Sequence, residues 1–98
     1  MNEMTVANYK LNFDPTLECN EAIVDLPEES EVLSVEIRDN KPTLYINYMA
    51  PTENFEIDLS KRIHFIICKR EYTEVDVKRY RYIGNVNVGR TIFAVFCN

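Results

Sequence analysis

The side chains that most often carry out chemistry are few in this chain and far apart. Three cysteines, Cys19, Cys68 and Cys97, and a single histidine, His64, are the candidate ligands for a soft metal ion. No two of them have the Cys-x2-Cys or His-x3-His spacing that most structural zinc sites require. An odd number of widely spaced cysteines is also no disulfide framework. We therefore expect three free thiols in a reducing compartment, with no bound metal and no cofactor.

The same residues argue against catalysis. Covalent catalysis needs a nucleophile, a base and a third group that orients the base. His64 lies inside a strongly apolar stretch, where a histidine more often hydrogen-bonds across a sheet, and no second histidine can activate a cysteine. The two glycines, Gly84 and Gly89, suit turn or bulge positions and form no phosphate-binding loop. We expect a protein that is not an enzyme.

Charge is distributed unevenly along the chain. Residues 1–60 carry 3 basic and 13 acidic side chains, whereas residues 61–98 carry 8 basic and 3 acidic ones. Aromatic rings lie among the later cations, and Arg or Lys beside such rings can hold a phosphate while the rings stack on a base. The candidate ligand-binding residues are therefore Arg70, Tyr72, Lys78, Arg79, Tyr80 and Arg81.

A second arrangement would leave these cations without a ligand. Basic strands can pair with acidic strands of the same sheet, so that the charges cancel across the strands, and we consider this the more common outcome. Alternation would also place Arg79 and Arg81 on one face of a strand and Tyr80 and Tyr82 on the other. A long nucleic acid is disfavoured by the net charge of −5.

The acidic residues suggest a different kind of contact. Glu28, Glu29 and Glu31 form the densest group. An acidic face can imitate a phosphate backbone and block a basic site on another protein. It can equally be a solvated surface that keeps a small protein soluble. Both interpretations remain open at this point.

The elements that position these residues are strands, because apolar and polar residues alternate with a period of two. We expect strands at residues 5–12, 21–26, 31–38, 43–49, 62–69, 79–88 and 91–97, and a tight turn at 39–41 with Asn40 at positive φ. Over residues 31–38, strict alternation would direct Leu33, Val35 and Ile37 to one face of the strand, and Val32, Ser34, Glu36 and Arg38 to the other. Residues 50–60 should form a loop, with an edge segment at Phe55 and Ile57, and residues 70–78 are ambiguous.

These expectations define a single all-β domain over residues 1–98, an antiparallel sandwich or partly open barrel of about six to eight short strands. No apolar run approaches the ~20 residues of a membrane helix, and the start lacks a signal-peptide pattern, so we expect a soluble cytosolic protein. The stretches 62–69 and 91–97 are apolar on both faces and need cover on both. A loop over the sheet or a second copy of the chain would supply it.

The order and spacing of several short motifs resemble a known family. They are Tyr9-Lys10, Leu26-Pro27, Val32-Leu33-Ser34-Val35, Pro42-Thr43-Leu44-Tyr45, Tyr82-Ile83-Gly84 and Ile92-Phe93-Ala94-Val95-Phe96. From about Asn8 to Phe96, the chain resembles a family of small, uncharacterised all-β domains of bacteriophage and prophage proteins. It departs from that pattern at Lys69-Arg70-Glu71-Tyr72, where a short Gly-rich turn with His is expected, and at Tyr45, where Trp is common.

The resemblance implies a setting rather than a chemistry, since the family has no established activity or catalytic residues. It implies a phage accessory protein that acts in the host cell cytoplasm. We expect it to act by binding, first of all by neutralising a host antiviral defence through contact with a host protein. The alternative is an oligomeric sponge that sequesters a cyclic oligonucleotide or an ADP-ribose derivative. A third possibility is a structural or assembly protein of the virion.

Overall fold

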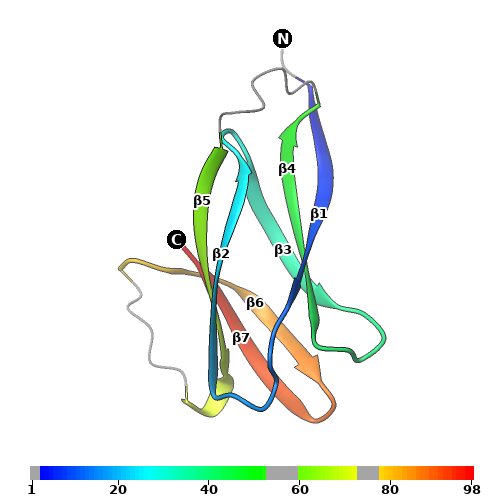
Figure 1. Ribbon diagram of the computed structural model, residues 1–98, viewed down its shortest axis with the longest axis vertical. Helices are drawn as coiled ribbons and strands as arrows, with labels where there is room; N and C mark the ends of the chain where they lie inside the picture. The colour runs from blue at the N-terminus through cyan, green and yellow to red at the C-terminus, as the bar shows by residue number, and fades with distance from the viewer. Residues whose placement is uncertain (1–2, 53–59, 73–77) are drawn as a thin grey trace.

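The computed structural model describes residues 3–52, 60–72 and 78–98. These residues form seven strands and one short 3-10 helix, as Figure 1 shows. The elements are β1 (Met4–Asn12), β2 (Cys19–Pro27), β3 (Glu31–Ile37), β4 (Thr43–Pro51), β5 (Ser60–Lys69), η1 (Arg70–Tyr72), β6 (Arg81–Val88) and β7 (Thr91–Cys97). The predicted all-β class is confirmed. Within the described residues, no helix is long and apolar enough to cross a membrane.

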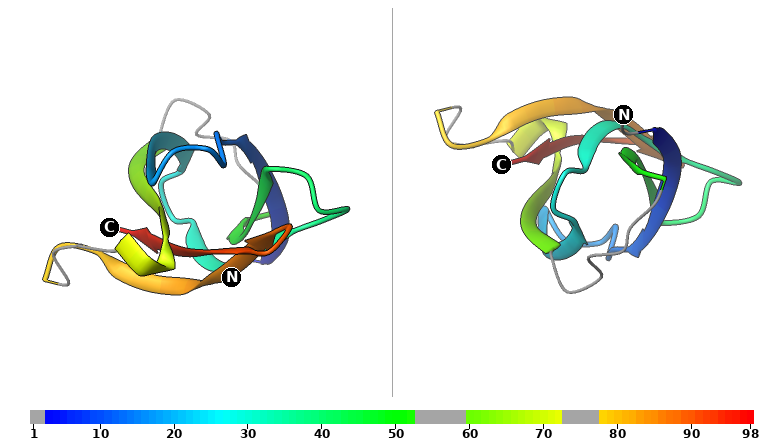
Figure 2. Two further views of the ribbon diagram at one scale, coloured as in Figure 1. Left: turned by 90° about the horizontal axis from the view of Figure 1, so that it is seen from below. Right: turned by 90° about the horizontal axis from the view of Figure 1, so that it is seen from above.

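The strands form two antiparallel sheets. One sheet has the order β1-β4-β3 and the other β2-β5-β7-β6. Seen end-on in Figure 2, the two sheets surround a common interior. At one side β3 packs beside β6, where a Cβ added to Gly84 would lie 3.8 Å from Cγ2 of Val35. The predicted small antiparallel sandwich is therefore the observed architecture.

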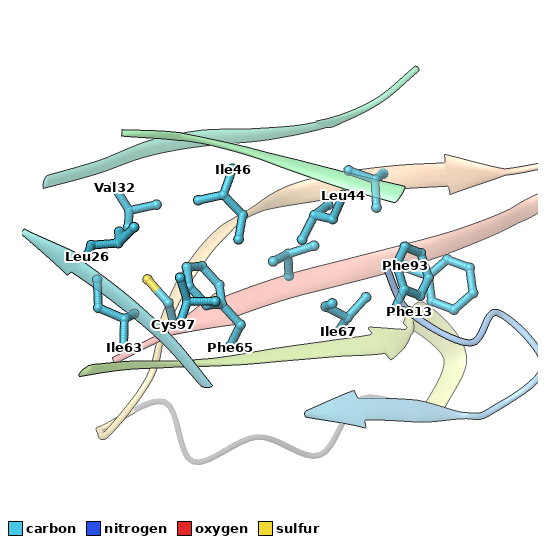
Figure 3. Packing of buried hydrophobic residues seen from close by; sticks show 13 residues of the cluster. Phe13, Leu26, Val32, Leu44, Ile46, Ile63, Phe65, Ile67, Phe93 and Cys97 are labelled. Atoms are coloured by element: carbon cyan, nitrogen blue, oxygen red, sulfur yellow. The ribbon is translucent and has the colours of Figure 1, made fainter. Parts of the chain in front are cut away.

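The core is built from the inward-facing residues of both sheets (Figure 3). Leu44 and Ile46 of β4 meet Phe65 and Ile67 of β5, and all four side chains are fully buried. Each such burial contributes about 1.5–3 kcal/mol to folding. Phe13, in the loop between β1 and β2, closes one end with its ring edge-on to Phe93 at 5.2 Å between centroids.

The two stretches that are apolar on both faces, β5 and β7, are neighbours at the centre of the four-stranded sheet. On the outer face of β7, Ala94 and Phe96 are only 5% and 7% exposed. Part of this cover comes from Tyr82, whose ring lies 5.6 Å from that of Phe96, and η1 also packs against β7. The chain itself thus buries Ala94 and Phe96 on the outer face of β7, whereas Ile92 on the same face is 37% exposed.

The turns form where local sterics require them. Asp39 and Asn40 both adopt positive φ, at 56° and 58°, and Lys41 N donates to the carbonyl of Arg38 at 3.3 Å. The prediction for Asn40 is confirmed. Its side-chain oxygen also accepts a hydrogen bond from the backbone nitrogen of Gly89 at 2.8 Å, so the β3–β4 turn is bonded to the β6–β7 turn.

The predicted strict alternation of β3 is wrong, because a β-bulge interrupts the strand. The register against β4 shifts between Val32 and Ser34. Leu33 therefore does not share a face with Val35 and Ile37 as expected, and Val32 lies on the core side with these two residues instead. Val32 is consequently buried, at 5% exposure, whereas Leu33 is 43% exposed. A second shift, between Tyr82 and Gly84, interrupts the pairing of β6 with β7. β6 also begins at Arg81, two residues later than predicted.

The expectation of three free thiols is wrong. Cys19 and Cys68 lie directly opposite each other in the β2–β5 pair and form a disulfide, whereas Cys97 is free and buried. The two cysteines are 49 residues apart in the sequence, and their contact could not be predicted from the sequence because it depends on the register of β2 against β5. Disulfides persist mainly in oxidising compartments, so the cysteines no longer support a reducing one. The predicted edge segment at Phe55 and Ile57 lies outside the described residues.

Candidate ligand-binding hollow

A shallow hollow of about 400 Å³ lies where β6 begins and β7 ends. We call it the β6–β7 hollow. The residues around it are cationic, aromatic or neutral, and no acidic side chain lines it within the described part of the chain. Its lining consists of Lys78, Arg79, Tyr80, Arg81, Tyr82, Phe96, Cys97 and Asn98.

Four of the six ligand-binding residues predicted from the sequence come together here. Lys78, Arg79, Tyr80 and Arg81 line the hollow. Arg70, in η1, is not part of the described lining, and the side chain of Tyr72 lies outside the described residues.

The sequence analysis missed three lining residues, Phe96, Asn98 and Cys97. Phe96 and Cys97 are the last residues of β7, and Asn98 comes directly after it. They reach the hollow because β7 pairs with β6. Tyr82, one of the rings that lie among the later cations, also lines the hollow, although it was not among the six candidate ligand-binding residues. The sequence shows that Tyr82 and Phe96 are aromatic, but the contact between their rings depends on the pairing of β6 with β7.

Arg81 and Tyr82 point to opposite faces, as the alternation predicted. Arg81 stands opposite Cys97 in the ladder, and Tyr82 stands opposite Phe96. The guanidinium of Arg81 donates to the carbonyl oxygen of Val32 in β3 at 3.5 Å and lies 3.9 Å from Sγ of Cys97. Arg81 thus bridges the two sheets at one wall of the hollow.

The thiol of Cys97 is held in its neutral form. Burial raises the pKa of Cys97, and the nearby charge of Arg81 offsets this only in part. The side chain is 1% exposed. Burial therefore disfavours the thiolate, which is the reactive species, and Cys97 packs as a core residue.

The hollow presents one exposed aromatic ring. Tyr82 is 53% exposed, and its ring packs against the buried ring of Phe96. On the neighbouring segment, the guanidinium carbon of Arg79 lies 6.0 Å from the ring centroid of Tyr80. A planar ligand can therefore contact a supported ring, with a guanidinium close by.

A chain of polar groups runs from the four-stranded sheet to the hollow. His64 Nε2 lies 3.4 Å from Oε1 of Glu21, and His64 Nδ1 lies 2.8 Å from the hydroxyl of Tyr80. The backbone of His64 is fixed by Asn98, which accepts a bond at its Oδ1 at 2.8 Å and donates from its backbone nitrogen at 3.2 Å. The structure thus shows His64 in the hydrogen-bonding role expected from the sequence.

Cross-strand cancellation of charge occurs between β5 and β2. Nε of Arg62 in β5 lies 3.4 Å from Oδ1 of Asp25 in β2. An exposed ion pair of this kind contributes about 0–1 kcal/mol to folding stability. Across the described residues, neither Arg79 nor Arg81 forms an ion pair with an acidic side chain. The charges of these two arginines are therefore not cancelled by a described acidic side chain.

The three predicted acidic residues lie together at the connection between β2 and β3. Glu28, Glu29 and Glu31 are all exposed, and none of their side chains makes an ion pair or hydrogen bond in the part of the chain that the structure describes. Ser30, between them, is 2% exposed, and its hydroxyl has no hydrogen-bond partner there.

The fold and the hollow define a small antiparallel β-sandwich with a cationic and aromatic depression at the end of one sheet. No group of three or more His, Cys, Asp or Glu side chains that could hold a metal ion occurs among the described residues. Comparisons of the chain with protein-family models, with curated proteins and with solved structures found no match.

Proposed function

We propose that this protein binds a small phosphorylated ligand of the nucleotide class in the β6–β7 hollow. One observation carries the proposal. The hollow gathers three cations, Lys78, Arg79 and Arg81, around the exposed ring of Tyr82 and has no acidic side chain in its described lining.

The role of each residue follows from the geometry. Tyr82, whose ring packs against Phe96, is the stacking surface. Stacking of a base on an aromatic side chain contributes about 1–3 kcal/mol to binding. Arg79 is the cation best placed for a phosphate, because a guanidinium forms two parallel bonds to phosphate oxygens. Arg81 is already bonded to the carbonyl of Val32. One exposed ring and a shallow wall suit a single nucleotide unit.

The resemblance to bacteriophage domains supplies the setting that we propose. In an infected bacterium, a non-catalytic protein of this kind would sequester a nucleotide immune signal, such as a cyclic oligonucleotide or an ADP-ribose derivative. A second copy of the chain would supply the missing wall of the shallow hollow. The Cys19–Cys68 disulfide would then form reversibly, or after the protein leaves the reducing cytoplasm.

A thermal-shift titration tests this proposal. Cyclic dinucleotides, cyclic trinucleotides and ADP-ribose are added to the purified protein at high micromolar concentration. A ligand present at about 100 times its Kd adds about 2.7 kcal/mol of stability. The variants Arg79→Ala and Tyr82→Ala should each lose the shift.

The chain provides a matched control for each variant. Arg90→Ala removes an exposed arginine on the β6–β7 turn, and Tyr9→Ala removes a tyrosine of β1 that is 38% exposed. Both controls should keep the shift. If no nucleotide shifts the protein, or if the controls lose the shift as fully as the hollow variants do, the proposed function is wrong.

The acidic connection between β2 and β3 favours a second candidate, the binding of a host protein. Glu28, Glu29 and Glu31 are exposed and unpaired within the described residues, so they are free to meet a basic surface. Phage growth on a defended host, with the protein supplied in trans, is the measurement. Glu28→Lys with Glu29→Lys should abolish the protection, and Glu3→Lys with Glu18→Lys, which reverses two other exposed acids, should retain it. Equal protection by both pairs would discard this surface.

A further inference from the structure

The polar chain behind the hollow has a definite direction. Glu21 and His64 are diagonal neighbours on the outer face of the β2–β5 pair, because Glu21 stands opposite Ile66 and His64 stands opposite Ile23. The carboxylate of Glu21 faces Nε2 of His64 at 3.4 Å, and the phenol of Tyr80 faces Nδ1 at 2.8 Å. Glu21 and Tyr80 are the ionisable groups in contact with the imidazole within the described residues.

This arrangement assigns the protons. An ionised carboxylate can only accept a hydrogen bond, so the neutral imidazole carries its proton on Nε2, facing Glu21. Nδ1 is then an acceptor, and the hydroxyl of Tyr80 must donate its only proton to it. The Tyr80 oxygen is left with lone pairs alone and can only accept a hydrogen bond from any further partner.

Tyr80 also belongs to the lining of the β6–β7 hollow. A ligand group that donates, such as an amino group on a base, matches the Tyr80 oxygen. A ligand that offers only hydrogen-bond acceptors at that point would place an acceptor atom against the Tyr80 oxygen, and no hydrogen bond could form between them. Such a ligand would give up a hydrogen bond to water and form none with Tyr80.

We propose that Tyr80 is a specificity-determining residue of the hollow that selects a nucleotide whose base carries an amino group, and that His64 and Glu21 are its positioning residues. This inference rests on the proposed function, since it names the ligand that the same hollow prefers. The residues then have separate roles, because Arg79 and Tyr82 bind the nucleotide whereas Tyr80 distinguishes between bases.

The test compares two probes that differ in one group. Adenosine 5′-monophosphate and purine riboside 5′-monophosphate share their sugar, phosphate and ring system, and only the first carries the amino group. Binding is measured by calorimetry at about pH 8, where histidine side chains are generally neutral. One hydrogen bond of about 1 kcal/mol predicts about fivefold tighter binding of the amino probe.

The variants separate selection from binding. Tyr80→Phe keeps the ring but removes the oxygen, so both probes should bind with the same Kd. His64→Leu removes the acceptor at Nδ1, which frees the Tyr80 hydroxyl to donate, so the fivefold ratio should fall toward one. Glu21→Gln should reduce the ratio without abolishing binding. A purely structural role of His64 would weaken both probes equally and leave their ratio unchanged.

The possible failures are distinguishable. If neither probe binds while cyclic nucleotides or ADP-ribose do, or if both bind the wild-type protein equally and Tyr82→Ala abolishes both, the proposed function stands and this inference is wrong. If no nucleotide of any kind binds, the proposed function itself fails. Since Tyr80→Phe could disturb the fold, its melting temperature is measured first, and His64→Leu then provides an independent test of the same ratio.

Discussion

Cys19 of β2 and Cys68 of β5 lie directly opposite each other and are joined by a disulfide. Cys19 is exposed, whereas Cys68 is 1% exposed. Beside them, the backbone nitrogen of Lys69 donates to the carbonyl of Glu18 at 2.7 Å. The bond therefore fastens β2, at the edge of the four-stranded sheet, to β5 at its centre.

The first prediction concerns the stability that this bond provides. Closing a loop of this length in the unfolded chain stabilises the folded state by about 4 kcal/mol in the chain-entropy model. Cys19→Ser removes the bond at its exposed end and leaves no cavity. We expect urea unfolding to show a loss of about 2–4 kcal/mol. A thiol reductant should weaken the wild-type protein and leave Cys19→Ser unchanged; equal sensitivity of the two proteins would contradict the disulfide.

The second prediction follows from the bulge in β3. Val32→Ala should cost about 1.5–3 kcal/mol, because the side chain is buried in the core. Leu33→Ala removes a larger side chain, yet it should change stability by only about 0.5 kcal/mol, because Leu33 is exposed. Denaturant unfolding of both variants measures the difference. The reverse order would restore the strict alternation expected from the sequence alone.

The third prediction concerns Ser30, whose hydroxyl is buried without a partner among the described residues. A buried unsatisfied hydroxyl costs about 1–3 kcal/mol, so Ser30→Ala should stabilise the protein. A gain of about 1 kcal/mol would raise the melting temperature by about 4–8 °C. Ser34→Ala is the contrasting variant, because that hydroxyl accepts a bond from Asn47 at 3.0 Å and its loss should not stabilise. A lower melting temperature for Ser30→Ala would show that the hydroxyl has a partner.

The fourth prediction is a pH dependence. Burial raises the pKa of Cys97 in the folded protein. An acid whose pKa is higher in the folded state binds its proton more tightly there, so its contribution to stability is complete below the unfolded pKa, about 8.5. That contribution is lost as the pH rises from there through the folded pKa. Unfolding free energies measured from about pH 7 to 10 should therefore fall more steeply for the wild-type protein than for Cys97→Ala. Parallel profiles would mean that the thiol does not titrate differently in the two states.

Part of the candidate site was predictable from residue types alone. Arg79 and Tyr80 stand out because cations beside aromatic rings suit a phosphorylated aromatic ligand, and both line the hollow. Phe96 and Asn98 were not predictable as lining residues. They join the hollow only because β7 pairs with β6.

By itself, the sequence determined the features that depend on neighbouring residues. The period of two produced the strands, since successive side chains of an extended chain point to opposite faces. The positive φ of Asn40 was expected because a short polar side chain tolerates that conformation. The apolar character of both faces of β5 and β7 indicated that both faces need cover, and the structure places the two strands as neighbours at the centre of their sheet.

Tertiary structure decided which distant residues meet. The disulfide of Cys19 with Cys68, the outward turn of Leu33 and the chain from Glu21 through His64 to Tyr80 all depend on register or on the packing of one segment over another. A period-two pattern is the same in every strand and carries no record of its partner. The register is selected only when both sheets close over one core, because a slip by one residue would turn each buried face outward.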